Sequence, residues 1–305
     1  MSKPKILFQL DSDAVSSSFD AVVAIDAGVE HLLQYSEIRP DTVVPLVHGG
    51  MFTRGPADLK NTAIFVGGSD VQLGVEIGDK IRSAFFGPIR VSTMLDGNGA
   101  NTTASAAVLC GARHQELSEM DALVLGATGP VGTRVSELIL AGGGRVRLAS
   151  RTQAKADQLA SHIADGIANG IANGDSESPS DAVSRMSTLS SADVEQLGEH
   201  VNQCSVVFGC GAAGIELVDA AMLDAAGNLQ VAIDLNAVPP AGLGGIEATD
   251  KAIERGSRVD YGALGVGGLK MKIHKACIQR LFESNDQFLD TQEIFDIGQE
   301  IEASR

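Results

Sequence analysis

The sequence predicts an α/β protein of two domains, one of them built on a doubly wound parallel sheet. The length supports two domains, because 305 residues are about twice the usual size of one domain. Short apolar segments alternate with helical segments, which is typical of parallel sheets covered by helices. Glycine is also frequent, at 35 of 305 residues, and an excess of this kind is expected where many strands end in tight turns.

The first hundred residues predict one set of these elements. Residues 6–10, 21–25, 63–66 and 89–94 are short segments rich in Val, Ile and Phe, as buried strands are. Apolar residues recur at helical spacing between residues 71 and 85. A β–α–β arrangement with short loops is the simplest interpretation.

The segment 101–111 consists of small side chains and predicts a helix that links the two domains. Strands and helices alternate again beyond it, with the spacing of a doubly wound sheet. The predicted strands are 121–125, 145–149, 204–208 and 231–235, and the predicted helices are 131–141, 152–163 and 192–200.

Residues 164–190 interrupt this alternation. Ile-Ala-Asn-Gly occurs twice in tandem, at 167–170 and 171–174, and a stretch rich in Ser, Asp and Pro follows. Turn-forming residues at this density predict a surface loop inserted into the second domain.

The C-terminal part predicts a glycine-rich segment at 262–268, an amphipathic helix through Phe282 and a final helix at 291–302. We expect this last part to complete the first domain. The predicted domains are therefore residues 1–100 plus 268–305, and residues 101–267 with a Rossmann-like fold.

Charge and composition exclude several classes of partner. The chain has 23 basic and 39 acidic residues, a net charge of −16, and no tryptophan. Binding to nucleic acid or to an anionic membrane surface requires clustered Lys and Arg, so neither is expected. No apolar segment approaches the ~20 residues that span a bilayer, and the apolar segment after Lys5 is too short for a signal peptide.

Cysteine and histidine give no indication of a metal site. The four cysteines lack the spacing of metal ligands, and His31 and His48 have no companion ligands nearby in the sequence. Free, buried thiols in a reducing cytoplasm are the expected state, and no metal is predicted. The cysteines are Cys110, Cys204, Cys210 and Cys277.

The strongest local motif is a G-x-x-G-x-x-G turn between a predicted strand and a predicted helix. Glycines permit a tight turn and a close approach of the backbone, and proline is well tolerated in the first turn of a helix. The N–H groups at the start of such a helix bind a pyrophosphate, so a dinucleotide cofactor is predicted, although a turn without a ligand has the same pattern. The predicted contacts are Gly126, Thr128, Gly129, Pro130, Val131 and Gly132.

The next strand indicates which dinucleotide is bound. An NAD site places Asp or Glu about 20 residues after the glycines, where this chain has Ser150 and Arg151, with Lys155 close by. Basic side chains at this place suit the 2′-phosphate of NADP. NADP is therefore the predicted cofactor, with NAD as a weaker alternative, and a solvated surface arginine is the other interpretation.

Two later strand ends complete the predicted cofactor site. Ala212 follows the strand at 204–208, and Asn236 follows the strand at 231–235. Ligands of open α/β sheets bind at the carboxyl ends of the strands, so both residues are candidate contacts. Asp234 and Asn236 are equally well explained as residues that cap a loop.

Several uncommon sequence strings occur together in this chain. They cover Lys5 to about Phe295, apart from residues 164–190, and they resemble the NAD(P)-dependent methylene-tetrahydromethanopterin dehydrogenases of bacterial one-carbon metabolism. The strings are Leu7-Phe8-Gln9 with Asp11 and Asp13, Thr62-Ala-Ile-Phe-Val-Gly-Gly68, Phe85-Phe-Gly-Pro88, Leu95-Asp-Gly-Asn-Gly-Ala-Asn-Thr-Thr103, Thr128-Gly-Pro-Val-Gly132, Gly244-Gly-Ile-Glu-Ala-Thr-Asp250 and Gly262-Ala-Leu-Gly-Val-Gly-Gly-Leu-Lys270.

The resemblance implies a hydride transfer from the methylene bridge of a reduced pterin to NADP, with a methenyl cation as the product. Some members also accept methylene-tetrahydrofolate. It further implies a cleft between a cofactor domain and a pterin domain, and a trimer-based homo-oligomer. The chemistry needs little acid–base catalysis, because the enzyme mainly holds the bridging carbon close to the nicotinamide.

The resemblance also implies the pterin site. Lys270 matches a lysine used in catalysis or pterin positioning, although a surface lysine at a helix start is an alternative and Lys272 and His274 lie close to it in the sequence. Asp20 is a candidate pterin contact that is also explained as a turn former. The remaining candidate contacts are Asn98, Asn101 and Thr102.

Two other functions remain open from the sequence. A shikimate-dehydrogenase-like NADP oxidoreductase would also use Ser150 and Arg151, but it needs a Lys–Asp pair as general base in the substrate domain. The lysines of the first hundred residues lie in no such motif. A redox sensor that binds NADP without turnover is the second alternative, and it would have no use for a substrate domain.

Overall fold

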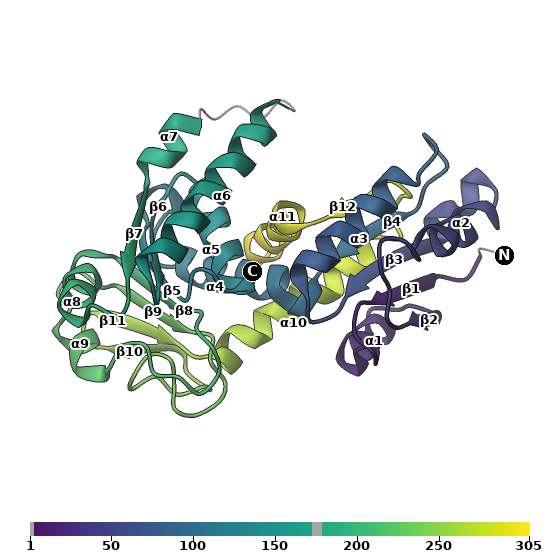
Figure 1. Ribbon diagram of the computed structural model, residues 1–305. Helices are drawn as coiled ribbons and strands as arrows, with labels where there is room; N and C mark the ends of the chain where they lie inside the picture. The colour runs from purple at the N-terminus through teal and green to yellow at the C-terminus, as the bar shows by residue number, and fades with distance from the viewer. Residues whose placement is uncertain (1–2, 173–178) are drawn as a thin grey trace. The chain divides into compact units, whose positions relative to one another are not determined.

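The structure is a computed structural model that describes residues 3–172 and 179–305 (Figure 1). It divides into two compact units, each with its own sheet of wholly or mostly parallel strands, which confirms the predicted α/β class. Unit 1 comprises Met1–Thr102 and Leu269–Arg305, and unit 2 comprises Thr103–Gly268. The chain passes between the units within α4 (Ala100–Ala112) and within α10 (Ala263–Arg280).

Unit 1 contains, among its described residues, a five-stranded parallel sheet in the order β12-β4-β3-β1-β2. The strands are β1 (Ile6–Asp11), β2 (His31–Tyr35), β3 (Thr62–Gly67), β4 (Ser92–Leu95) and β12 (Phe288–Leu289). The α-helices of the unit, besides parts of α4 and α10, are α1 (Ser18–Asp26), α2 (Val44–Phe52), α3 (Val71–Ser83) and α11 (Thr291–Ala303). Short 3-10 turns lie at Pro56–Asn61 and Gly97–Gly99.

Successive side chains along the strands of unit 1 point to opposite faces of the sheet and pack against different helices. Ile64 and Val66 of β3 belong to a buried core with Val47 of α2 and Ile77 of α3. Phe65, between them, points to the opposite face, where its ring stacks on His274 of α10. The loops after β1, β3 and β4 therefore meet at one edge of the sheet, because parallel strands all end on the same side.

Unit 2 contains, in its described part, a seven-stranded sheet in the order β10-β11-β9-β8-β5-β6-β7, and only the β10–β11 pair is antiparallel. The strands are β5 (Asp121–Leu125), β6 (Arg145–Ser150), β7 (Met186–Ser190), β8 (Val206–Gly209), β9 (Val231–Asp234), β10 (Lys251–Arg255) and β11 (Arg258–Tyr261). The helices, besides parts of α4 and α10, are α5 (Pro130–Ala141), α6 (Gln153–Ala172), α7 (Pro179–Ser184), α8 (Val194–Gln203) and α9 (Ala220–Ala225), with a 3-10 turn at Leu117–Glu119.

Most predicted elements of both units occur in the structure, but the strand predicted at 21–25 is wrong. These residues belong to α1, which Ser17 caps by accepting a hydrogen bond from the Asp20 N–H. Val22 and Ile25 are exposed on this helix, so its apolar residues form a continuous series that resembles a buried strand. The true second strand, β2, was missed because this edge strand has mostly exposed side chains.

The loop predicted at 164–190 is also wrong over most of its length. Helix α6 continues to Ala172, α7 follows, and β7 pairs in parallel with β6. Residues 173–178 lie outside the described part. The first part of α6 was predicted as the helix at 152–163, whereas β7 was missed because Leu189 is its single fully buried side chain.

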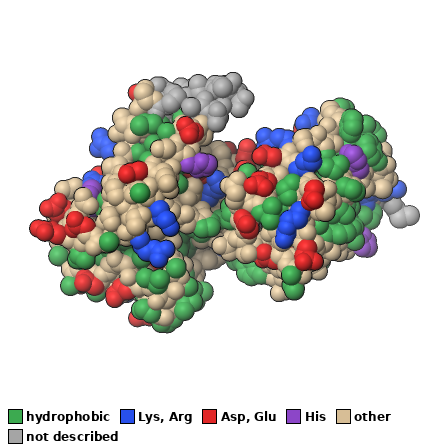
Figure 2. Space-filling view, viewed as in Figure 1, with side chains coloured by type: hydrophobic (Ala, Val, Ile, Leu, Met, Phe, Trp, Pro, Cys, Tyr) green, Lys and Arg blue, Asp and Glu red, His purple; other side chains and the backbone are tan. Residues whose placement is uncertain are grey.

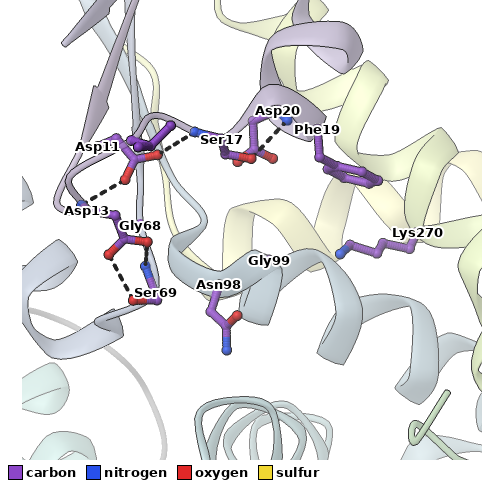
Figure 3. Close-up of a pocket in the computed structure, with 11 residues that line it drawn as sticks. Asp11, Asp13, Ser17, Phe19, Asp20, Gly68, Ser69, Asn98, Gly99 and Lys270 are labelled. Carbon is purple, nitrogen blue, oxygen red and sulfur yellow. Dashed lines mark hydrogen bonds between the residues drawn. The ribbon is translucent and has the colours of Figure 1, made fainter. Parts of the chain in front are cut away.

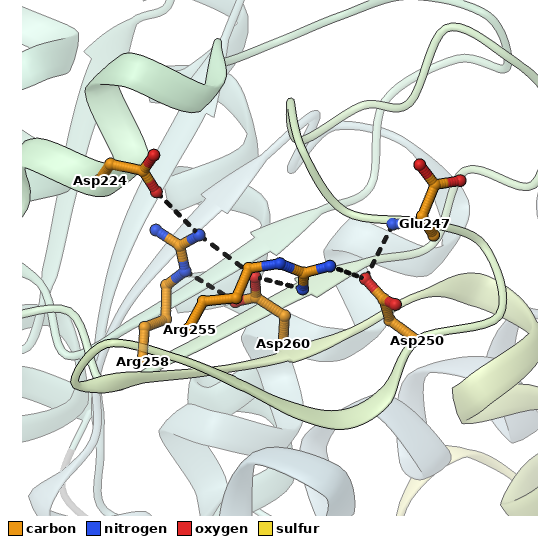
Figure 4. Close-up of polar contacts among 6 residues, drawn as sticks. All are labelled: Asp224, Glu247, Asp250, Arg255, Arg258 and Asp260. Carbon is orange, nitrogen blue, oxygen red and sulfur yellow. Dashed lines mark hydrogen bonds and ion pairs between the residues drawn. The ribbon is translucent and has the colours of Figure 1, made fainter.

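The β10–β11 hairpin of unit 2 is held by a network of two arginines and three aspartates (Figure 4). The fully buried Asp260 accepts hydrogen bonds from Arg258 Nε at 2.7 Å and Arg255 Nη1 at 2.9 Å. Arg255 also donates to Asp250 at 2.7 Å, and the same carboxylate accepts the Glu247 N–H. The network thus fixes the loop at 247–250 on the hairpin.

This loop explains part of the glycine-rich segment at 262–268. The segment begins directly after β11, at Gly262, and continues as the first turns of α10. A Cβ atom at Gly262 would lie 2.0 Å from Glu247 O, and one at Gly265 would lie 1.8 Å from Asp250 O. These two glycines permit a backbone-to-backbone contact within unit 2.

The surface agrees with the charge pattern of the sequence. Figure 2 shows acidic and basic side chains interspersed on the visible face of both units, with no broad basic area among the described residues drawn there. Among the described residues, none of the helices has the length and hydrophobicity of a membrane-spanning segment.

Candidate functional site

A pocket in unit 1 opens at the edge of the sheet where β1, β3 and β4 end (Figure 3). Open α/β sheets bind ligands at this edge, so the position alone makes it a candidate site. Its walls come from the loop after β1, from α1, from the loops after β3 and β4, and from α10. The lining residues are Asp11, Asp13, Val15, Ser17, Phe19, Asp20, Gly68, Ser69, Asn98, Gly99 and Lys270.

Two of the three lining carboxylates hold loops in place. Asp11 accepts the N–H groups of Asp13 and Ser17, each at 2.9 Å. Asp13 accepts the Ser69 N–H at 3.0 Å and the Ser69 hydroxyl at 2.8 Å, and thereby ties the first loop to the loop after β3. Their oxygens are engaged by the protein, so Asp11 and Asp13 shape the pocket.

The third carboxylate, Asp20, lies in the first turn of α1 and belongs to the predicted pterin contacts. Burial raises its pKa above the usual value of 3.8, and the neighbouring Asp96 raises it further, while His274, Ser17 and Lys270 lower it. Asp20 Oδ2 lies 3.7 Å from the position of a Cβ at Gly67, so the carboxylate rests against the end of β3.

Lys270 reaches the same pocket from α10, where it lies two turns inside the helix and not at its start. Its Nζ is 5.4 Å from the centre of the Phe19 ring, a distance suited to a cation–π interaction. A Cβ at Gly99 would lie 2.6 Å from this Nζ, and Gly99 has a φ of +59°. Glycine at position 99 therefore leaves the passage through which the ammonium group enters the pocket (Figure 3).

The remaining predicted pterin contacts lie in or directly after the loop that follows β4, and only one of them lines the pocket. Asn98 is exposed and lines the pocket with a φ of +54°. Asn101 and Thr102 are buried beneath it and are not among the lining residues. Thr102 donates its hydroxyl to Asp96 at 2.7 Å, and the Asn101 amide group donates to Leu95 O at 2.7 Å. Both side chains thus organise the loop, in which burial raises the pKa of Asp96.

His274 is a residue that the sequence interpretation noted only as a neighbour of Lys270. It lies one helical turn after Lys270 on α10, is 1% exposed, and neither ring nitrogen has a hydrogen-bond partner in the described part of the chain. Its ring stacks on Phe65 with centroids 5.6 Å apart, and the Phe19 ring is 6.5 Å away. Burial lowers the pKa of His274 from 6.5 to about 4, against the attraction of Asp20. The i, i+4 spacing from Lys270 is the signal that could have identified it.

Unit 2 contains the predicted glycine turn between β5 and α5, with Pro130 as the first residue of the helix. Gly126 has a φ of +72°, and its Cβ would lie 2.8 Å from the backbone of Cys210. A Cβ at Gly132 would lie 2.5 Å from Gly126 O and 2.8 Å from Ala127 Cα. Both positions therefore require glycine if the turn is to keep this shape.

The N-terminus of α5 is open to a ligand. Gly129 occupies the N-cap position, no side chain caps the helix, and Thr128 beside it is exposed. The first N–H groups of a helix have no partners within the helix, and Val131 and Gly132 supply two of these groups here. Such an uncapped start, approached through glycines, suits a pyrophosphate.

The basic residues after β6 are also available to a ligand. Arg151 and Lys155 are exposed, and within the described residues neither side chain forms a hydrogen bond or an ion pair. Ser150 is buried at the end of the strand. Ser190 of β7 donates its hydroxyl to Arg151 O at 3.2 Å, so the strand missed in the sequence supports this corner.

The two remaining cofactor candidates differ from each other. Ala212 is exposed in the loop after β8. Asn236 is buried, accepts the Val238 N–H at 2.9 Å, and donates to Pro240 O at 2.8 Å. Asp234, whose pKa is raised by burial, accepts the N–H groups of Asn236 and Gly242. Asp234 and Asn236 thus have the loop-capping contacts that the sequence left as one of two interpretations.

The cysteine and histidine side chains do not form a metal site in the described part of the chain. None of the four cysteines forms a disulfide bond in the described part of the chain, and three of them are buried. No group of three or more His, Cys, Asp or Glu residues with the geometry of a metal site occurs within the described ranges. His48 lies in an aromatic cluster with Phe52 and Phe86, and His31 is an exposed residue of β2.

The chain is similar to a family model, to curated proteins and to solved structures. A family model described as "Methylene-tetrahydromethanopterin dehydrogenase, N-terminal" matches residues 18–98. "Bifunctional protein MdtA" of Methylorubrum extorquens is 41% identical over 308 residues, covering 99% of this chain and 100% of the relative. "NAD(P)-dependent methylenetetrahydromethanopterin dehydrogenase" of the same organism is 28% identical, covering 93% of this chain and 94% of the relative. The solved structure of quinate dehydrogenase from Corynebacterium glutamicum in complex with NAD covers 98% of this chain and all of that chain, with 13% identity and a TM-score of 0.49.

Proposed function

The chain belongs to the methylene-tetrahydromethanopterin dehydrogenase family, and on this premise we propose that it oxidises methylene-tetrahydromethanopterin with NADP as the hydride acceptor. The similarity to the relative at 41% identity extends over 99% of the chain, and this supports the proposed activity for the whole protein. The observation that carries the mechanism is the approach of Lys270 and Asp20 to one pocket from two different helices (Figure 3). Neither a shikimate-dehydrogenase-like enzyme nor a redox sensor without turnover corresponds to this family.

The glycine turn of unit 2 fits a nicotinamide dinucleotide. Gly126 and Gly132 keep the turn tight, because a Cβ at either position would overlap the protein backbone, and the uncapped start of α5 offers N–H groups to the pyrophosphate. Arg151 and Lys155 would bind the 2′-phosphate, which supports NADP over NAD. When bound, the nicotinamide supplies the acceptor for a hydride.

Asp20 serves the pterin side of the reaction through its charge. The methylene carbon between the two nitrogens loses one hydrogen together with both bonding electrons. It stays bonded to both nitrogens and becomes a methenyl carbon. No proton is released, so no general base is required, but a positive charge develops over the N–C–N unit. A fixed carboxylate beside this unit stabilises the developing cation. Asp20 has this role, because Asp11 and Asp13 are engaged in holding loops.

Lys270 serves the same site by positioning. An ammonium group next to a forming cation would repel it, so stabilisation of the charge is excluded as its role. Its three N–H donors instead suit a pterin carbonyl or ring nitrogen. Contact with the Phe19 ring and attraction to Asp20 hold the ammonium group in the pocket.

The proposal extends to methylene-tetrahydrofolate as a second substrate. Its reactive part is the same methylene bridge between two nitrogens, so Asp20 and Lys270 would act on it in the same way. We expect the two pterins to differ in KM more than in kcat, because they differ outside the reacting atoms.

Optical assays test the function directly. The purified protein is mixed with NADP or NAD and with either methylene-pterin, and the methenyl product and the reduced nicotinamide are followed together. Equal rates of formation of the two products, with NADP preferred, are expected. Binding of NADP without turnover of either pterin would contradict the proposal.

A further inference from the structure

His274 is a buried polar side chain whose nitrogens the protein leaves without partners. It is 1% exposed, and both ring nitrogens lack hydrogen bonds in the described part of the chain. Buried polar groups without a partner destabilise a fold, and a phenylalanine would stack on Phe65 equally well without this cost. The imidazole at this place therefore indicates that His274 forms a hydrogen bond when a ligand is bound.

The surroundings of His274 point to the pocket behind which it lies. Lys270 lines the pocket one turn earlier on α10, and the ring of Phe19, another lining residue, is 6.5 Å from the imidazole. A Cβ at Gly67 would lie 3.0 Å from the Phe65 ring, on which His274 stacks, and 3.7 Å from Asp20 Oδ2, so the Asp20 carboxylate lies near the imidazole. Two further charged groups act on Asp20, Lys270 from α10 and Asp96 from the loop after β4.

We propose that His274 is a positioning residue that donates a ring N–H to the Asp20 carboxylate when a pterin fills the pocket. This inference rests on the proposed function, since it names the group that keeps Asp20 ionised and oriented while the cation forms. An imidazole that stays neutral retains one N–H to donate and brings no positive charge towards the cation. The N–H replaces hydrogen bonds from water that Asp20 loses when the pterin covers it.

The direction of the pH effect follows from the charge states. Burial raises the pKa of Asp20, and an N–H donated to its ionised form lowers that pKa. Activity needs the ionised form, so it is lost as the pH falls through the pKa of Asp20. Removal of the donor raises this pKa and moves the acidic limb of the rate profile to higher pH.

Three substitutions at position 274 test the proposal. His274→Phe keeps the stacking and removes both nitrogens, whereas His274→Asn and His274→Gln each retain an N–H donor near the place of one ring nitrogen. We expect the phenylalanine variant to lose about 10-fold in kcat, with a smaller change in the KM for the pterin, and to show the shifted acidic limb. One of the amide variants should recover most of the kcat.

Matched controls separate this role from packing. His48→Phe makes the same exchange in unit 1 within the aromatic cluster of α2, and it should leave both kcat and the pH profile unchanged. In an Asp20→Asn background, His274→Phe should have no further effect, because the negative charge that the N–H keeps in place is already absent. Unfolding of each variant by denaturant shows whether it is folded under the assay conditions.

The outcomes are distinct from those for the function itself. If the unmodified protein turns over neither pterin, the proposed function fails. If it turns over but His274→Phe keeps full kcat and the same acidic limb, the role of His274 is wrong. The same conclusion holds if neither amide variant recovers activity, or if the loss is equally large in the Asp20→Asn background.

Discussion

The pocket of unit 1 and the glycine turn of unit 2 lie at the same kind of place, the carboxyl edge of a parallel sheet, but they are built differently. The turn is made of backbone, and its shape depends on glycines such as Gly126 and Gly132, into whose space no Cβ fits. The pocket is made of side chains from five segments of the chain. A backbone site suits a pyrophosphate, which differs little between dinucleotides, whereas a side-chain site is suited to one reacting group.

We expect substitutions in the glycine turn to act by changing the shape of its backbone. Gly132→Ala places a Cβ 2.5 Å from Gly126 O, and relief of this overlap requires a shift of the backbone. We expect a loss of about 3 kcal/mol in the free energy of unfolding and about 100-fold in NADP affinity. Denaturant unfolding and a binding titration with NADP measure the two effects.

Gly166→Ala is the matched control for this exchange. Gly166 lies on α6 with open space around it, so alanine should stabilise the helix by up to about 1 kcal/mol and leave NADP binding unchanged. Equal behaviour of the two variants would contradict the role of shape in the turn.

Substitutions in the pocket act through charge, and Asp20→Asn is expected to have the largest effect there. The amide keeps the size of the side chain and removes the charge that stabilises the cation, so kcat should fall about 100-fold with little change in NADP binding. Steady-state kinetics at saturating NADP measure this loss. Asp26→Asn, at the exposed end of the same helix, should keep full activity; a similar loss in both variants would refute the assignment.

Lys270→Met removes the ammonium group and keeps much of the length of the side chain. Loss of a charge-assisted hydrogen bond to the pterin should reduce kcat/KM for the pterin by about 30-fold. Lys272→Met is the control, because Lys272 is exposed two residues further along α10 and does not line the pocket. If Lys272→Met has the larger effect, the lysine of the site has been misassigned.

Arg151→Ala tests the contact with the cofactor and has the smallest expected effect. It should raise the KM for NADP about 10-fold and leave the KM for NAD unchanged, because only NADP has a phosphate at this place. Arg145→Ala, at the other end of β6, should change neither value. Equal changes for NADP and NAD in the Arg151 variant would show that the arginine does not contact the 2′-phosphate.

The difference in construction also explains which parts of the site the sequence could predict. The glycine turn and Arg151 lie within about 25 residues and follow directly from the order of strand, turn and helix. Asp20 and Lys270 are 250 residues apart, and a resemblance to a family was needed to bring them together. Asn101 and Thr102 were adjacent to the site in sequence, but their side chains lie below the turn at Gly97–Gly99. The Thr102 hydroxyl donates to Asp96, and the Asn101 amide group donates to Leu95 O.

The errors in the fold have a related cause. Helix α1 was predicted as a strand because its exposed face has apolar residues, Val22 and Ile25, where a surface helix usually has polar ones. The edge strands β2 and β7 were missed because few of their residues are buried. Hydrophobic patterns report burial, so strands with few buried residues, such as β2 and β7, give a weak signal.

The most direct test of the account follows the hydrogen itself. Methylene-tetrahydromethanopterin carrying two deuterium atoms on the bridging carbon is oxidised with NADP, and both products are analysed by mass spectrometry. We predict one deuterium on the reduced nicotinamide, one retained on the methenyl carbon, and none in the solvent. Deuterium in the solvent, or methenyl product without labelled reduced cofactor, would contradict a direct hydride transfer by this protein.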